Sequence, residues 1–313
     1  MDILAIKFPL LFLVFNRPDT TKKVFERIRA ARPSRLFIAA DGPRSGREDD
    51  VRKCAEVKKI VSGVDWPCEV TTLFREKNLG CRRAVSSAIT WFFENVEEGI
   101  ILEDDCLPDI SFFKYAGELL ECYRADERIG MVCGANFQFG SRRTMDSYYF
   151  SRYPHVWGWA SWRRVWQKYD AEMKIWPEIK SGGWLNDHFN NKAQVEYWRK
   201  IFDSVYEGKI DTWDYQLSLT FITNHYMSVI PNVNLISNLG YCGEATHTAG
   251  GGGVLSEMKT LPMNFPLIHP DFMIKDALAD KKVENLFFKS HGTLELIKHN
   301  IKVSIKKMLK IKK

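Results

Sequence analysis

Strand-like runs alternate with helical patterns over roughly the first hundred residues, and this alternation constrains the fold more than any other feature of the sequence. The runs span residues 8–15, 36–40, 69–74 and 99–102, and the segments between them carry apolar residues at helical spacing. Largely apolar runs of this length are typical of strands in a parallel sheet that is covered on both faces. The pattern predicts an α/β fold: a doubly wound, mostly parallel sheet flanked by helices, with a ligand site at the carboxyl ends of its strands.

The second half of the chain is less regular and rich in aromatic residues. We expect helices at 111–124, near 190–207 and at 212–223, strands near 129–133 and at 228–230, and an irregular aromatic stretch at 147–166. No linker, repeat or low-complexity segment interrupts the sequence before the four glycines at 250–253. The sequence therefore predicts one domain over residues 1–290, with halves of about 1–110 and 111–260, and a separate tail at 291–313.

The formal net charge of +6 belongs to that tail. Seven lysines and no acid lie between Lys298 and Lys313, which leaves 38 basic against 39 acidic residues in the preceding 297. A near-neutral body argues against nucleic-acid binding, which spreads basic residues over a folded face. An apolar stripe at helical spacing predicts that residues 294–313 form a basic amphipathic helix on an anionic membrane surface. A helix packed on the domain and a disordered basic end are the alternatives.

The cysteines and the N-terminal sequence indicate the compartment. Seven cysteines without any C-x-x-C pair predict neither a disulfide framework nor a zinc site. No signal peptide pattern is present at the N-terminus, and no stretch offers the roughly 18 apolar residues of a membrane span. We therefore expect a cytoplasmic protein, held peripherally at the inner face of the cytoplasmic membrane where the tail binds lipid.

Three successive acids, Glu103, Asp104 and Asp105, follow the fourth strand-like run directly. Their mutual repulsion costs stability unless a cation or hydrogen-bond donors compensate it. Carboxylates are ligands that Mg²⁺ and related hard cations prefer, and these ions also share the phosphate oxygens of substrates. The triplet therefore indicates a divalent metal, with a solvated acidic turn as the alternative.

Taken with Asn16-Arg17-Pro18, Asp41-Gly42 and Asn78-Leu79-Gly80 at the ends of the first three runs, the acidic triplet resembles the GT-A-fold nucleotide-sugar glycosyltransferases. Its Glu-Asp-Asp form is similar to the D-x-D motif of the N-acetylglucosaminyltransferase I-like families. The closer resemblance is to bacterial sugar transferases from polysaccharide gene clusters, and it rests on residues 78–82, 102–106 and 157–162. It covers roughly residues 8–250 and is more specific for the fold and the donor class than for the sugar.

The resemblance implies a donor site. Asn16, Arg17 and Asp41 would hold the nucleoside, with Asp41 accepting from the uracil N3–H. Asp105 would bind the Mn²⁺ or Mg²⁺ that bridges the two phosphates, and Glu103 or Asp104 would contact the ribose or a metal-bound water. A helix that begins near Gly80 favours phosphate at its N-terminus, and we expect help there from Arg75, Lys77, Asn78, Arg82 and Arg83. For any one of these bases, a solvated surface position is the alternative.

The transfer step needs a base for the acceptor hydroxyl if the anomeric configuration inverts. The resemblance favours Asp214, with Asp211 in reserve, although either carboxylate could instead cap a helix, Asp211 in particular. His247 lies in a glycine-rich segment expected to form a flap, where the resemblance implies a metal ligand or a diphosphate contact. Either Trp157 or Trp159 is expected to stack on a sugar, since indoles favour the C–H faces of sugars.

These assignments predict a metal-dependent, inverting glycosyltransferase. It would move a sugar from a nucleoside diphosphate, UDP in our expectation, to a hydroxyl of a cell-surface glycan or lipid-linked oligosaccharide. The first half would bind the nucleotide and the second half the acceptor. One alternative is a sugar-phosphate nucleotidyltransferase, although Asn16-Arg17-Pro18 stands where that class has a glycine-rich loop. The other is a non-catalytic glycan-binding protein on the same fold.

Overall fold

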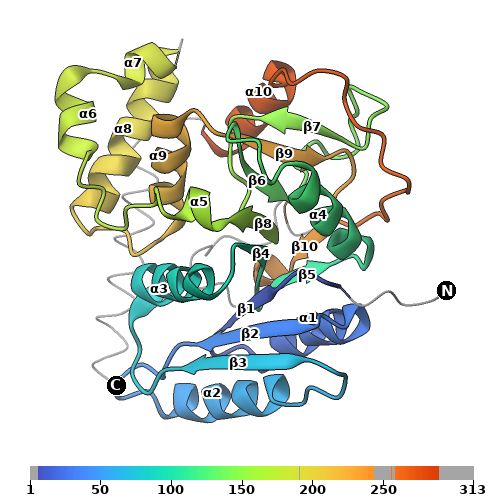
Figure 1. The fold of residues 1–313 in the computed structure, drawn as a ribbon. Coiled ribbons are helices and arrows are strands. Elements are labelled where there is room, and N and C mark those ends of the chain that lie inside the picture. Colours follow the sequence, from blue (N-terminus) through green and yellow to red (C-terminus); the bar gives the residue numbers. More distant parts are fainter. Residues whose placement is uncertain (1–5, 190, 243–254, 256–257, 289–313) are drawn as a thin grey trace.

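The computed structural model describes residues 6–189, 191–242, 255 and 258–288. Within these ranges, eight strands form one sheet in the order β3-β2-β1-β4-β8-β6-β9-β7, and two short strands, β5 and β10, form another. β7 and β8 run opposite to the other six strands of the large sheet. Helices flank this sheet (Figure 1). The predicted α/β class, with a mostly parallel sheet flanked by helices, is confirmed.

The elements have the following bounds. The strands are β1 (Leu10–Val14), β2 (Arg35–Ala40), β3 (Glu69–Phe74), β4 (Glu98–Glu103), β5 (Cys106–Pro108), β6 (Ile129–Cys133), β7 (Tyr148–Ser151), β8 (Trp159–Trp162), β9 (Met227–Pro231) and β10 (Ile236–Asn238). The helices are α1 (Pro18–Ala31), α2 (Glu48–Val61), α3 (Gly80–Asn95), α4 (Ser111–Cys122), α5 (Arg163–Trp166), α6 (Trp176–Gly182), α7 (Leu185–His188), α8 (Lys192–Tyr206), α9 (Asp214–Asn224), α10 (Ala277–Phe287) and the 3-10 helix η1 (Leu239–Cys242).

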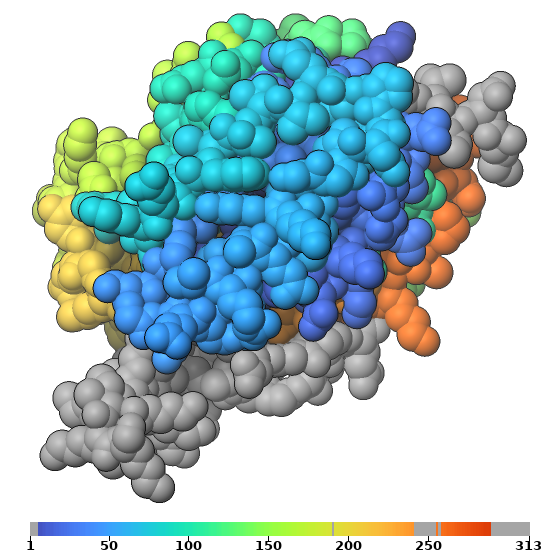
Figure 2. Space-filling model, turned by 90° about the horizontal axis from the view of Figure 1, so that it is seen from below, coloured from blue at the N-terminus to red at the C-terminus, as the bar shows by residue number. Residues whose placement is uncertain are grey.

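The first half folds as the alternation predicts. Every residue of β1 is buried, and β1 lies between β2 and β4, with which it pairs in parallel. The chain adds strands outward from β1 to β3 and then crosses back through α3 to β4 on the other side of β1. This reversal of strand order is the switch point at which doubly wound sheets open a crevice for ligands. The blue to cyan half of the chain makes up most of the face seen in Figure 2.

The second half contains the expected helices and strands together with elements that we did not predict. α4, β6, α8, α9 and β9 match their predicted positions closely. The irregular aromatic stretch holds β7 and β8, each only four residues long and buried at every position. A strand covered on both faces shows no alternation of polar and apolar residues, and four residues are too few to separate it from a buried turn. β8 pairs antiparallel with β4 and β6, so it joins the two halves of the sheet.

Two clusters of buried side chains hold the described residues together. The larger surrounds the sheet and includes Phe12, Phe37 and Trp159. The smaller lies among α6, α8 and α9 and includes Trp176, Trp198 and Phe202. These helices form a group beside the sheet, apart from α10 at the β7 edge (Figure 1). Among the described helices, none is both long and apolar enough to cross a membrane.

Candidate active site

The carboxyl ends of β1, β2 and β4 bring the predicted donor residues to one edge of the sheet. Glu103 is the last residue of β4 and pairs in register with Leu13 of β1. Asn16 and Arg17 follow β1 directly, and Asp41 follows β2. Because parallel neighbours end at the same edge, these side chains lie together although they are far apart in the sequence.

Arg17 pairs with two of the three successive acids. Its guanidinium Nη1 lies 2.6 Å from Asp105 Oδ2 and 3.4 Å from Asp104 Oδ1. The second oxygen of Asp104, Oδ2, accepts the backbone N–H of Phe15 at 3.1 Å. Burial works against the charge of Arg17, yet the carboxylates of Asp104 and Asp105 raise its pKa above the usual value. The guanidinium therefore supplies part of the charge compensation that the acidic triplet requires.

Glu103 and Asp214 approach each other from the two halves of the chain. Burial first, then the carboxylates of Asp105, Asp104 and Asp214, raise the pKa of Glu103 well above its usual value, and Arg17 acts in the opposite direction. Asp214 opens α9, where its Oδ1 accepts the backbone N–H of Tyr215 at 3.0 Å and the hydroxyl of Thr212. The carboxylate of the predicted base is therefore close enough to the predicted metal site to act on the charge of Glu103.

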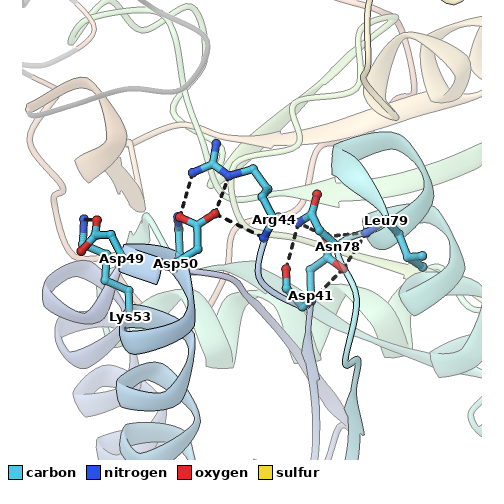
Figure 3. A network of polar contacts seen from close by, with 9 residues as sticks. Asp41, Arg44, Asp49, Asp50, Lys53, Asn78 and Leu79 are labelled. Carbon is cyan, nitrogen blue, oxygen red and sulfur yellow. Dashed lines mark hydrogen bonds and ion pairs between the residues drawn. The ribbon is translucent and has the colours of Figure 1, made fainter. Parts of the chain in front are cut away.

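Asp41 joins the end of β2 to the loop before α3. Its carboxylate accepts from Asn78 Nδ2 at 2.8 Å, from the backbone N–H of Leu79 at 3.0 Å and from that of Gly42 at 2.9 Å. Figure 3 shows Asn78 and Leu79 turned towards it. Burial raises the pKa of Asp41, while the Leu79 and Gly42 donors act to lower it. The turn-forming alternative for Asp41 is thus present in the structure, and its contact with a uracil remains a prediction.

A second polar network beside Asp41 contains two residues that the sequence analysis did not single out. Asp50, in the first turn of α2, accepts from the Arg44 guanidinium (Figure 3). It also accepts from Asn16 Nδ2 at 2.8 Å. The hydrogen bond with Arg44 is the main cause that lowers the pKa of Asp50 to about 2, in spite of burial. Asn16 is therefore held by α2. The only sequence signal for this network was an acid in the first turn of a predicted helix. Acids are common at that position, so the signal did not single out Asp50.

The N-terminus of α3, where we expected phosphate, is occupied by carboxylates of the chain. Asp211 Oδ2 accepts the N–H of Cys81 and Asp211 Oδ1 that of Arg82, both at 3.0 Å, while Asp41 accepts that of Leu79. Gly80 has φ +81°, and a Cβ there would lie 2.8 Å from Asp211 Oδ2. Asp211 therefore caps a helix, as the alternative for this residue predicted. The helix that it caps is α3, not the helix α9 that follows it in the sequence.

The predicted phosphate-binding bases do not converge at this helix end. Arg82 bonds to Ala171 O at 3.0 Å and pairs with Glu172. Arg75 donates to Ser87 Oγ at 2.7 Å, and Lys77 and Arg83 are exposed. The expectation of a phosphate cradle at the start of α3 needs correction, because a backbone N–H that already serves a carboxylate is not available to a phosphate. Any contribution of these bases to donor binding remains a prediction.

The two tryptophans proposed for sugar stacking differ in exposure. Trp159 is 1% exposed and stacks on Trp213 at a centroid distance of 5.9 Å, so the prediction of a sugar contact is wrong for this residue. Its position in β8, at the middle of the sheet, accounts for its burial. Trp157 is half-buried, 5.0 Å from the ring of Phe137, and stays a candidate.

Two predictions fall outside the described residues: His247 with its glycine-rich segment, and the amphipathic tail at 294–313. Within the described ranges, no group of three or more His, Cys, Asp and Glu side chains is arranged to hold a metal ion. A cation that keeps its waters and shares substrate phosphates needs only one or two carboxylates. Asp105 and Glu103 offer these hard oxygen ligands in a cluster with excess negative charge, so the donor set fits Mg²⁺ or Mn²⁺.

No protein-family model and no curated protein matches this chain. Among solved structures, it is similar to a UDP-glucose pyrophosphorylase complexed with UDP-glucose, at 9% identity and a TM-score of 0.36, over 72% of this chain and 90% of that one. It is also similar to 4-diphosphocytidyl-2C-methyl-D-erythritol synthase from Anaerococcus prevotii, at 10% identity and a TM-score of 0.31, over 63% of this chain and 84% of that one.

A cytidylyltransferase from Leptospira borgpetersenii is similar at 13% identity and a TM-score of 0.31, over 56% of this chain and 71% of that one. These three proteins are nucleotidyltransferases, the class that the sequence analysis kept as an alternative, and none of the three is a glycosyltransferase. At such low identities and TM-scores, the likeness carries no conclusion about what this chain binds or does.

Proposed function

We propose that the protein is a metal-dependent glycosyltransferase that moves a sugar from a nucleoside diphosphate to a hydroxyl of a glycan or lipid-linked oligosaccharide. The observation that carries this proposal is the meeting of three parts at one sheet edge: the acids 103–105, Arg17 from the end of β1, and Asp214 from α9. A guanidinium beside clustered carboxylates can compensate the negative charge of a leaving diphosphate. A separate carboxylate can act as the base.

The donor's diphosphate is assigned to the edge formed by Arg17 and Asp105, because the N-terminus of α3 is already occupied. Asp105, with Glu103 beside it, would hold Mg²⁺ or Mn²⁺, which when bound neutralises the charge that develops on the diphosphate. Arg17 adds a second positive charge and can donate to a phosphate oxygen. The nucleoside then lies near Asn16 and Asp41, and uridine is the base that the resemblance to GT-A enzymes supports.

The transfer is a single displacement. The acceptor hydroxyl oxygen forms a bond to the anomeric carbon while the bond from that carbon to the diphosphate oxygen breaks. The electron pair of the broken bond leaves with the diphosphate, and Asp214 takes the hydroxyl proton. Attack on the face opposite to the leaving group inverts the anomeric configuration.

The connection between β1 and α1 supports a glycosyltransferase over a nucleotidyltransferase. β1 ends at Val14 and α1 begins at Pro18, so only residues 15–17 connect them. A loop that cradles a triphosphate needs several free backbone N–H groups. Here the N–H of Phe15 already serves Asp104, and Pro18 has none.

An assay of released products tests the proposal. The full chain is incubated with UDP-sugars and Mn²⁺ without acceptor, and in parallel with UTP, a sugar 1-phosphate and Mg²⁺. We expect slow release of UDP in the first mixture and no pyrophosphate in the second. Release of pyrophosphate would identify a nucleotidyltransferase instead, and binding of UDP-sugars without any product would identify a glycan- or nucleotide-binding protein.

Two variants localise the activity. Asp105→Asn should lower the rate of UDP release at least about a hundredfold, since charge stabilisation at the leaving group contributes several kcal/mol. Asp187→Asn changes an exposed acid of α7 in the same way and serves as the matched control, with an unchanged rate. Equal rates in the two variants would place the reaction elsewhere.

A further inference from the structure

Exposed apolar side chains gather at one end of the sheet. Fourteen large apolar side chains are exposed in the part of the chain that the structure describes, and seven of them lie between residues 139–145 or 261–278. Six of these seven, with exposed fractions between 48% and 78%, define what we call the edge patch: Phe139, Met145, Ile268, Phe272, Ile274 and Leu278. Contiguous apolar surface on a folded protein usually marks a place that binds something.

The two segments that carry the edge patch are bonded to each other. The backbone N–H of Ser147 donates to Ile268 O at 2.8 Å, and the N–H of Ile268 donates to Ser147 Oγ at 2.9 Å. Further along, Arg143 Nε lies 3.3 Å from Asp276 Oδ2. The loop before β7 and the segment before α10 therefore run side by side at the β7 edge of the sheet.

The charges around the edge patch are mostly positive. Apart from Arg143, which pairs with Asp276, the exposed charged side chains at 139–146 and 268–282 are four cations, Arg142, Lys275, Lys281 and Lys282, against one acid, Asp271, while Asp146 is half-buried. Asp276 is engaged as the N-cap of α10 and with Arg143, and Asp280 is buried. This excess of cations stands out in a body that is near neutral as a whole. Apolar side chains rimmed by lysine and arginine match the chemistry of an anionic lipid surface.

One segment of the edge patch, the loop before β7, lies at the same edge of the sheet as the acidic site. β7 runs antiparallel to β9, and its first residue, Tyr148, pairs with Pro231 at the carboxyl end of β9. The loop 139–147 therefore lies at the edge where β1 and β4 also end. β7 is four places from β4 in the strand order, which at about 4.8 Å per strand separates them by roughly 19 Å.

We propose that the edge patch docks the protein on an anionic lipid surface. Phe272, Ile274 and their apolar neighbours enter the headgroup region, while the lysines and arginines around them meet lipid phosphates. A surface bound in this way lies beside the edge that carries the acidic site. The further step, that this surface presents a lipid-linked acceptor to that site, rests on the proposed function.

Sedimentation of the full chain with lipid vesicles tests the docking. Vesicles of phosphatidylcholine containing phosphatidylglycerol are compared with vesicles of phosphatidylcholine alone, and we expect binding to the former. Phe272→Ser with Ile274→Ser should lower binding about tenfold, because two exposed apolar side chains no longer enter the lipid. Ile175→Ser with Trp184→Ser is the matched control, an exposed isoleucine and an exposed aromatic residue on the α6–α7 side, and should bind like the wild type.

A variant without two of the lysines tests the electrostatic part of the binding. Lys281→Gln with Lys282→Gln should lower vesicle binding about tenfold at low salt and have little effect at high salt, where screening removes the attraction. Circular dichroism and the melting temperature check that each variant is folded.

Three outcomes would overturn the docking proposal. The first is a full chain that does not sediment with anionic vesicles. The second is unchanged binding of the Phe272→Ser, Ile274→Ser variant, which would assign any lipid binding to other residues. The third is a wild-type dimer that this variant converts to a monomer without any vesicle binding, because the edge patch would then belong to a second copy of the chain. UDP release is measured separately, so its absence in the wild type counts against the proposed function alone.

Discussion

At the scale of single residues, two aspartates three positions apart have different tasks. Asp211 directs both carboxylate oxygens at the backbone of α3, whereas Asp214 lies near Glu103. Asp211 is therefore a positioning residue, because it ties the segment before α9 to the start of α3.

Replacing each aspartate in turn distinguishes a role in stability from a role in transfer. Asp211→Ala removes two hydrogen bonds from the N-terminus of α3 and should lower the free energy of unfolding by about 1 kcal/mol. Asp214→Asn should leave stability nearly unchanged and abolish transfer while UDP-sugar still binds. Urea unfolding and product release give the two readouts. Wild-type stability of Asp211→Ala, or full transfer by Asp214→Asn, would contradict the assignment.

Asp50 makes stability depend on acid pH. Its pKa of about 2 lies below the ordinary value of about 4, so the folded state holds the carboxylate ionised while the unfolded chain takes up a proton. The stabilisation is present above about pH 4 and is lost as the pH falls towards 2. Because Arg44 is 39% exposed, we expect only about 1 kcal/mol. Asp50→Asn should lose this amount at pH 7 and match the wild type at pH 2; an equal difference at both values would exclude the ion pair.

At the scale of elements, α3 shows why the site is arranged as it is. The N–H groups at its start are satisfied by Asp41, which follows β2, and by Asp211 from the segment before α9, so both halves of the chain meet at one helix end. The close approach depends on Gly80. Its backbone has a positive φ, which glycine adopts without strain because it lacks a Cβ, and a Cβ at this position would meet the Asp211 carboxylate.

A double-mutant cycle measures this dependence. Gly80→Ala should destabilise the protein by about 2 kcal/mol, since the new methyl meets the Asp211 carboxylate and alanine resists the positive φ. In the Asp211→Ala background the clash is gone, so the same change should cost about half as much. Thermal or urea unfolding of the four proteins yields the coupling energy. Additive costs would show that Asp211 does not approach Gly80.

The sequence predicted those parts of the site that follow from strand periodicity. Asn16 and Asp41 follow β1 and β2, Glu103 ends β4, and the carboxyl ends of such parallel strands must meet. Contacts such as that between Asp211 and Cys81, 130 residues apart, leave no local pattern and could not be predicted. β8 was missed because its four buried residues show no period, and this error left Trp159 as one of two candidates for a sugar contact although it belongs to the core.

At the scale of the whole molecule, α10 brings the last described part of the chain back to the sheet. Asp280 of α10 is buried, and its carboxylate accepts from Ser151 Oγ at 2.5 Å at the end of β7. Arg152 Nε lies 3.4 Å from the other oxygen. Ser151 and Asp280 are 129 residues apart in the sequence. Their contact attaches α10 to the strand at the edge of the sheet, beside the edge patch.

Burial raises the pKa of Asp280 to about 6, although Ser151 and Arg152 favour the ionised form. The folded protein therefore keeps a proton here that the unfolded chain loses at about pH 4, so stability falls as the pH rises from 4 to 6. Asp280→Asn removes this dependence without changing the size of the side chain. Relative to the wild type, it should gain about 2 kcal/mol above pH 6 and little below pH 4. Melting temperatures of both proteins between pH 3 and 8, with the exposed Asp271→Asn as control, test this; a pH-independent difference would mean that folding does not raise the pKa of Asp280.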